Sequence, residues 1–160
     1  MSWITKSWKS YLAALLCTAG LLAIADASAI YLKAQLAQVL IKQAWGQTIS
    51  SGDDVKPWPW ADTWPVARLQ LVQSATDLYV LQGAQGSTLA FGPGWLDDSV
   101  SPDQPGTKLI AGHRDTHFKF LEHVKNNDLL SLVTKQGVEQ QYRVNSIQII
   151  DINKDQLLVD

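Results

Sequence analysis

The chain has 160 residues, with 13 Lys and Arg against 15 Asp and Glu, which gives a formal net charge of -2 at pH 7. This balance argues against a nucleic-acid-binding protein, because such proteins usually carry a basic patch and a high isoelectric point. A hydrophobic fraction of 46% is ordinary for a folded protein and argues against wholesale disorder. The single cysteine excludes a disulfide framework and a metal site built from several cysteines.

The N-terminal segment predicts a membrane anchor. Residues 1–10 contain Lys6 and Lys9, and the apolar run at 11–32 reaches the roughly 20 residues that a membrane-spanning helix needs. Lysines ahead of the run place the N-terminus in the cytoplasm by the positive-inside rule. We therefore expect a cytoplasmic N-terminus at 1–10 and an uncleaved, single-pass signal anchor at 11–32 in the cytoplasmic (inner) membrane, with the following domain facing the periplasm.

Two other interpretations of this apolar run stay open. Its core is short and small-residue triplets such as Ala27-Ser28-Ala29 follow it, which is typical of a cleaved signal peptide. A buried helix of a soluble domain is the third interpretation. The one cysteine, Cys17, lies in the run, and we expect it to act as a small apolar residue rather than as a nucleophile.

Two connecting segments follow the predicted anchor. Apolar residues keep a helical spacing through 33–52 and predict a helical stalk, for which Gly46 and Ser50-Ser51-Gly52 are the end signals. Residues 53–65 contain three prolines, which favour extended, polyproline-like backbone. This strap also carries three tryptophans, which we expect to pack it against the domain, with anchoring in lipid headgroups as the alternative: Trp58, Trp60 and Trp64.

From residue 66 the sequence predicts a mainly β domain. Short apolar segments, some with period-two alternation, recur with turn signals between them, and this pattern is typical of a sandwich or barrel. Residues 92–95 read as a turn, and residues 118–124 as a short helix with Asp115 or Thr116 as its N-cap. The predicted strands are 66–72, 78–81, 108–111, 129–134 and 141–150.

The candidates for chemistry are histidines. His113 follows a predicted strand and a glycine, so we expect it at the rim of the barrel, within reach of a substrate. In one hypothesis His113, Asp115 and His117 hold a metal in a metal-dependent hydrolase, although their spacing matches no common zinc motif. In the other, a histidine serves as general acid and base beside a nucleophile.

Two segments, taken in order, carry a family resemblance. Thr88-Leu-Ala-Phe-Gly-Pro-Gly-Trp95 and Gly106-Thr-Lys-Leu-Ile-Ala-Gly-His-Arg-Asp-Thr-His-Phe118 resemble the sortases, and the strap at 56–65 is similar to the Gram-negative, marine-type branch. Sortases are anchored cysteine transpeptidases with a β-barrel. Their cysteine attacks the Thr–Gly bond of a C-terminal sorting signal, their histidine acts as acid and base, and an amine acceptor resolves the thioester. The resemblance assigns the catalytic histidine to His113.

The resemblance does not extend to the nucleophile. In the family, a Thr-Leu-x-Thr-Cys segment and an arginine come after the strand that here ends near Asp151, but no cysteine follows Cys17 and no arginine follows Arg143. We therefore expect residues 66–160 to form an incomplete sortase-type β-barrel that lacks its C-terminal strands, exposes an unpaired edge and is inactive by itself. A non-catalytic, sortase-like peptide-binding module is the alternative. The expected partners are a sorting-signal protein, an amine acceptor and the membrane, with no metal, other cofactor or nucleic acid.

Overall fold

The computed structural model describes residues 2–150, so the last part of the predicted domain, 151–160, lies outside the described residues. The chain divides into two compact units, one up to Ala37 and one from Gln38 onward, and each is described by itself.

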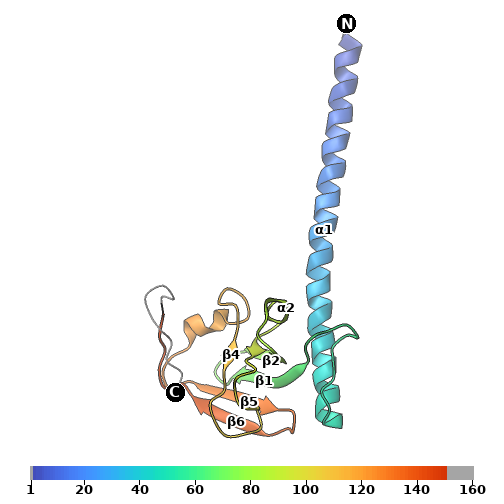
Figure 1. The fold of residues 1–160 in the computed structure, drawn as a ribbon. Coiled ribbons are helices and arrows are strands. Elements are labelled where there is room, and N and C mark those ends of the chain that lie inside the picture. Colours follow the sequence, from blue (N-terminus) through green and yellow to red (C-terminus); the bar gives the residue numbers. More distant parts are fainter. Residues whose placement is uncertain (1, 151–160) are drawn as a thin grey trace. The chain divides into compact units, whose positions relative to one another are not determined.

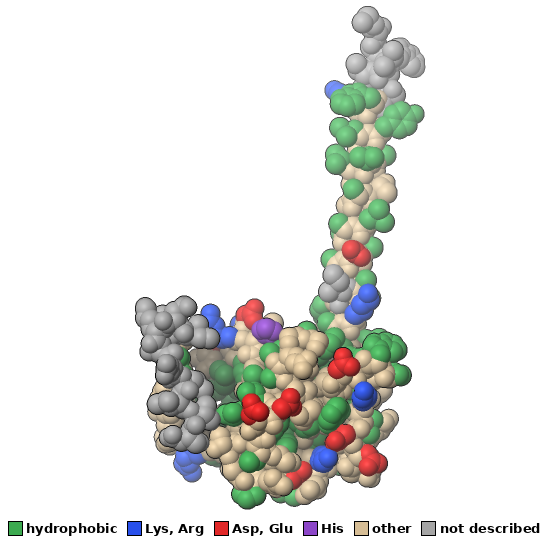
Figure 2. Space-filling model, viewed as in Figure 1, with side chains coloured by type: hydrophobic (Ala, Val, Ile, Leu, Met, Phe, Trp, Pro, Cys, Tyr) green, Lys and Arg blue, Asp and Glu red, His purple; other side chains and the backbone are tan. Residues whose placement is uncertain are grey.

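A single helix, α1 (Ser2–Ser51), occupies the N-terminal third of the chain. Between Trp8 and Ser51 it is long and apolar enough to cross a membrane, a property that a signal sequence or a core helix can share. Figure 2 shows apolar side chains along the N-terminal unit, and charged side chains are visible towards the two ends of the part that is described. The hydroxyls of Thr18 and Ser28 donate to the carbonyls four residues earlier, at 2.8 Å each, which satisfies these polar groups within the helix.

The helix passes through Gly46 and ends at Ser51, so the prediction that Gly46 contributes to its end is wrong. Gly52 supplies the stop because it adopts a positive φ of 79° and its N–H donates to the Thr48 carbonyl at 2.8 Å. This left-handed glycine after the last helical residue is a common helix end. Gly46, unlike Gly52, does not adopt a positive φ, so the helix continues past it.

The second unit contains a six-stranded sheet in the order β4-β3-β2-β1-β5-β6 (Figure 1). All neighbours pair antiparallel except β2 and β3, which are parallel. The elements are β1 (Pro65–Leu71), β2 (Asp77–Gln82), the short helix α2 (Gly86–Leu89), β3 (Gly94–Trp95), β4 (Ile110–Ala111), the 3-10 helix η1 (Lys119–His123), β5 (Leu129–Thr134) and β6 (Glu139–Arg143).

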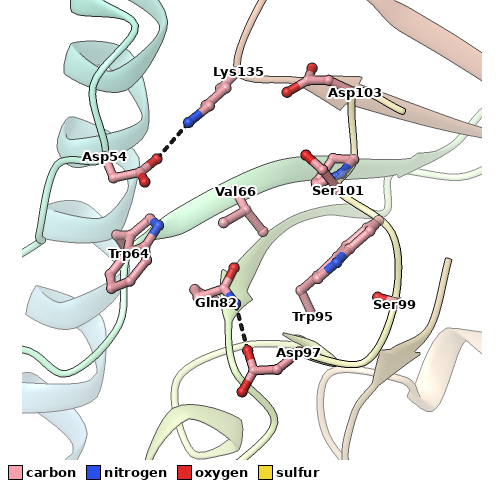
Figure 3. A pocket seen from close by; sticks show the side chains of 11 residues that line it. Asp54, Trp64, Val66, Gln82, Trp95, Asp97, Ser99, Ser101, Asp103 and Lys135 are labelled. Carbon is pink, nitrogen blue, oxygen red and sulfur yellow. Dashed lines mark hydrogen bonds and ion pairs between the residues drawn. The ribbon is translucent and has the colours of Figure 1, made fainter. Parts of the chain in front are cut away.

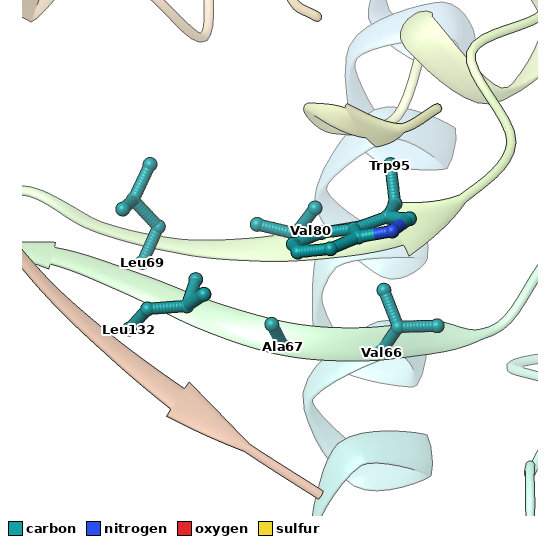
Figure 4. Packing of buried hydrophobic residues seen from close by; sticks show 6 residues of the cluster. All are labelled: Val66, Ala67, Leu69, Val80, Trp95 and Leu132. Atoms are coloured by element: carbon teal, nitrogen blue, oxygen red, sulfur yellow. The ribbon is translucent and has the colours of Figure 1, made fainter. Parts of the chain in front are cut away.

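The two faces of the sheet differ because strand side chains alternate. One face carries the buried apolar core, in which Ala67 lies opposite Val80 and Leu69 opposite Leu132. The indole of Trp95 extends from β3 over Val80 and is only 2% exposed (Figure 4). This core is what the period-two pattern predicts.

The other face packs on the end of α1. Arg68 and Tyr79 lie opposite each other there, and the Tyr79 ring is 6.3 Å from that of Trp45. Ile41 and Thr48, from the same side of the helix, are buried at 1% and 0% exposure. The stalk of the sequence prediction is therefore, from Gln38 onward, a structural part of the β unit.

The predicted mainly β fold with a preceding apolar helix is confirmed, and four local expectations need correction. Residues 94–95 are strand β3 rather than part of a turn, because they pair with β2 and β4. Strand β6 ends at Arg143, well short of 150. The predicted strand at 108–111 shortens to Ile110–Ala111. The helix at 118–124 is the 3-10 helix η1, with Phe118 rather than Asp115 or Thr116 at its N-cap.

The strap packs on the unit through two of its three tryptophans. Trp58 contacts Phe91 edge to face at 5.1 Å between ring centroids, and Trp64 is half-buried against the core cluster. The Thr63 hydroxyl donates to the Gln82 carbonyl at 2.7 Å. Trp60 is 80% exposed, so the packing prediction is wrong for this residue.

Candidate active site

His113 is exposed, two residues beyond the end of β4. Gly112 precedes it for a steric reason, since a Cβ at this position would lie 2.8 Å from the ring of Phe118. Phe118 is half-buried against the core and meets Phe120 edge to face at 5.9 Å. The start of the histidine loop is thus held by a packed aromatic side chain while the imidazole remains accessible to a substrate.

The backbone after His113 folds into a tight turn. The His113 carbonyl accepts the N–H of Thr116 at 3.3 Å and the N–H of Phe118 at 3.0 Å. The next N–H, of Lys119, donates to the Thr116 carbonyl at 3.2 Å. These bonds use the amides that a capping side chain at Asp115 or Thr116 would otherwise bind, which explains why the predicted N-cap is not formed.

His117 follows in the same turn and is half-buried, unlike His113. Burial lowers the pKa of His117, a hydrogen bond to the backbone of Ala90 partly opposes this effect, and the nearby charge of His113 lowers the pKa further. The direction of the net shift keeps the His117 ring neutral at pH 7. The third histidine, His123, is exposed on η1.

The turn at residues 90–92 is held by several other elements. The Gln38 side-chain amide donates to the Phe91 carbonyl at 2.7 Å, and the Phe91 ring contacts Trp58. A Cβ on Gly92 would lie 2.9 Å from the Tyr79 carbonyl, so only a glycine fits where this turn passes β2. The end of α1, the strap and β2 therefore all hold residues 90–92.

The metal hypothesis gains no support from the donor groups. Among the residues that the structure describes, no three His, Cys, Asp or Glu side chains come together as a metal site would require. Asp115 is exposed in the turn between the two histidines.

The resemblance implies a substrate-stabilising arginine, so the positions of the three arginines in the sequence matter. Arg68 is engaged on the helix-facing side of the sheet, where its guanidinium donates twice to the Asp77 carboxylate at 2.6 Å. These bonds lower the pKa of Asp77 and raise the pKa of Arg68. Arg114 and Arg143 are exposed, with Arg143 on the outer strand β6.

A cavity of about 360 Å³ lies away from the histidine loop. Gln82 donates to Asp97 at 2.6 Å and Lys135 pairs with Asp54 at 2.9 Å along its wall (Figure 3). Because β3 and β4 are antiparallel, the residues after Trp95 and the residues after Ala111 leave the sheet at opposite ends. His113 does not line this cavity. The sequence analysis did not predict the cavity, although the polar loop after Trp95 was a signal that could have located it. It is lined by Asp54, Trp64, Val66, Gln82, Trp95, Asp97, Ser99, Ser101, Pro102, Asp103 and Lys135.

The structure thus combines a six-stranded sheet with an exposed histidine that follows a glycine, and comparisons with known proteins show the family to which the chain belongs. The model of the Sortase domain matches residues 69–160, more than half of the chain, and this chain belongs to the sortase family. Among curated proteins, Sortase D of Bacillus subtilis (strain 168) is 30% identical over 83 residues. That match spans 52% of this chain and 41% of the relative, so the chain covers less than half of the relative's length.

Solved structures support the same fold. A Sortase D5 transpeptidase of Clostridium perfringens superposes with a TM-score of 0.56 at 14% identity, over 70% of this chain and 73% of that one. Sortase C-1 of Actinomyces oris gives a TM-score of 0.50 at 26% identity, over 56% of this chain and 54% of that one. The first likeness shows the fold alone, and it agrees with a sheet preceded by a helix.

Proposed function

We propose that this chain is the histidine-bearing part of a membrane-anchored sortase, a cysteine transpeptidase that cleaves a C-terminal sorting signal and transfers the protein to an amine acceptor. The observation that carries the proposal is the position of His113. Its ring is exposed at the end of a strand, on a loop fixed by Gly112 and Phe118, inside the region that the family model matches. An imidazole suits acid–base work because its ordinary pKa is close to neutrality.

The proposed reaction has two steps. In the first, a cysteine thiolate attacks the carbonyl carbon of the Thr–Gly bond, and His113 gives its proton to the departing glycine nitrogen, leaving a thioester. In the second, His113 takes a proton from the acceptor amine as the amine attacks the thioester, and the thiolate leaves. The same imidazole therefore donates one proton and recovers one, so each cycle returns the enzyme to its starting state.

The thiol for this reaction does not come from Cys17. This residue is the single cysteine of the 160 residues and lies in the apolar part of α1, where a thiolate would be disfavoured. The proposed reaction therefore requires a cysteine, and a substrate-stabilising arginine, from sequence outside these 160 residues. By itself, the 160-residue polypeptide should form no thioester.

A transfer assay tests this proposal. The purified chain is incubated with a sorting-signal peptide and an amine, and the products are followed by mass spectrometry. We expect neither an acyl-enzyme nor a transferred product from the 160-residue form, and either one would refute the assignment of the nucleophile. In a form that also carries the family's cysteine and arginine, transfer should occur, and His113→Ala should abolish it.

The missing thiol favours a second candidate function for this polypeptide, which is peptide binding without turnover. The same peptide, labelled with a fluorophore, distinguishes the two functions. Saturable binding to the 160-residue chain that is unaffected by adding the amine supports the binding module, and the absence of binding to this chain would exclude it.

The location proposed for the protein is the cytoplasmic membrane of a Gram-negative cell of the marine-type branch, with the β unit in the periplasm. It rests on the apolar helix and on the lysines that precede the apolar run. If residue 52 lies in the periplasm, alkaline phosphatase fused after this residue should be active. A reporter that works only in the cytoplasm, fused at the same site, should be inactive. An intact mass near 17.7 kDa for the membrane-bound chain would separate an anchor from a cleaved signal peptide.

A further inference from the structure

Phe118 contacts the backbone on both sides of His113. Its ring lies over Gly112, because the three atoms nearest to a Cβ built on Gly112 all belong to this ring, at 2.8, 2.9 and 3.0 Å. The N–H of Phe118 donates to the His113 carbonyl at 3.0 Å. One residue therefore touches the residue before the His113 Cα and also the carbonyl that follows this Cα.

The Phe118 ring is itself fixed by the core. It is half-buried and packs against the buried cluster that includes Trp95 and Leu132. It also meets Phe120 edge to face, with 5.9 Å between the ring centroids and 88° between the ring planes. Aromatic pairs in this arrangement are stabilised beyond the burial of their area. The Phe118 carbonyl accepts the N–H of Leu121 at 3.0 Å, so the backbone beyond the ring is held as well.

The other end of the histidine loop is tied to the sheet. Ala111 pairs with Gly94 of β3, so the chain arrives at Gly112 from a paired strand. His113 is the first exposed residue after this strand. A segment that is held at both ends has little conformational freedom. The direction in which the His113 side chain leaves the loop therefore depends on the two contacts made by Phe118.

We propose that Phe118 is a positioning residue for His113, whose imidazole direction it fixes through the ring seated on Gly112 and the N–H bonded to the His113 carbonyl. The proposal rests on the function proposed above for His113, but its test needs no nucleophile. Such positioning matters in catalysis because a misplacement of about 1 Å can slow a reaction about 100-fold.

Amide relaxation measured by NMR on the 160-residue chain in detergent micelles tests the proposal. A rigid backbone gives an order parameter of about 0.85, and a flexible one gives less than about 0.6. Phe118→Ala removes the ring, and the order parameter of the His113 amide should fall from the first value to below the second. Phe120→Ala is the matched control, since it removes an equal ring from the same core cluster but not the ring over Gly112. It should leave the His113 order parameter near about 0.85.

Gly112→Ala disturbs the same contact from the other side and leaves the core cluster intact. The added Cβ would lie 2.8 Å from the Phe118 ring, and real Cβ contacts are essentially never shorter than 3.0 Å, so the ring must move. We expect the His113 order parameter to fall in this variant too, while those of Leu69 and Leu132 in the sheet stay near about 0.85. This variant decides the question if Phe118→Ala is too unstable to measure.

Three outcomes would overturn the proposal. They are a His113 order parameter near about 0.85 in both the Phe118 and the Gly112 variant, an equal fall in Phe120→Ala, and an equal fall at the two core amides. Transfer by the cysteine-bearing form is the separate test of the catalytic assignment. If His113→Ala left that transfer unchanged while the order parameters behaved as expected, Phe118 would still fix the loop and the proposed function would be wrong.

Discussion

Gly94 should be the glycine in the sheet that tolerates a side chain least. It begins β3 and pairs with Leu81 of β2 and Ala111 of β4, so it joins the histidine-bearing edge of the sheet to the core. A Cβ on Gly94 would lie 2.3 Å from the carbonyl oxygen of Gly83, whereas real Cβ contacts are essentially never shorter than 3.0 Å. The obstacle is backbone, so β3 would have to move away by about 0.7 Å, the difference between these two distances.

The cost of Gly94→Ala follows from this displacement. Overpacking costs about 1–3 kcal/mol, and weakening one strand hydrogen bond adds about 0.5–1.5 kcal/mol, so we expect a loss of roughly 1.5–4.5 kcal/mol. At about 4 °C for each kcal/mol in a domain of this size, the unfolding midpoint should fall by roughly 6–18 °C. The buried indole of Trp95 is adjacent in sequence, so tryptophan fluorescence of the chain in micelles during heating reports the transition.

Gly46→Ala is the matched control for this experiment. Gly46 lies inside α1, and a Cβ there would meet nothing within 4 Å. The substitution should stabilise the helix by about 0.5–1 kcal/mol, because it removes conformational freedom from the unfolded chain. Equal midpoints for the two variants would refute the steric argument and, with it, the described pairing of β3 with β2.

Three further predictions follow from the packing and the charges. Leu132→Ala should lower the free energy of unfolding by about 2–5 kcal/mol in urea denaturation, whereas Leu121→Ala, at a position 42% exposed, should cost less than about 1 kcal/mol. The pKa of Asp77 is lowered by its bonds to Arg68, so its stabilising effect is present above the ordinary carboxyl pKa and is lost as the pH falls through the lower, folded value. Because the pair is 36% and 39% exposed, Asp77→Asn should remove less than about 1 kcal/mol at pH 7, and a larger loss would contradict this estimate. For His117 the folded pKa is also lowered, so stability should be full above the ordinary histidine pKa and fall as the pH drops below it, and this part of the pH dependence should vanish in His117→Gln.

Local chemistry made several features predictable. The apolar run specified a long helix, the alternation in residues 66–72 and the apolar segment at 129–134 specified β1 and β5, and the glycine–histidine segment pointed to the exposed His113. Each of these signals is contained in a few consecutive residues. Strand β3 was missed because two residues have no periodicity of their own and become a strand only by pairing on both sides.

The remaining features depend on contacts between distant residues. The close approach of Gly92 to the Tyr79 carbonyl and the fixing of Phe91 by Gln38 each join segments that no sequence pattern places together. By itself, the sequence determined the helix, most of the strands and the histidine to which a resemblance points, because these depend on neighbours along the chain. Only the tertiary structure decided that His117 is partly buried and which glycines leave no room for a side chain, because burial and steric overlap depend on distances in space.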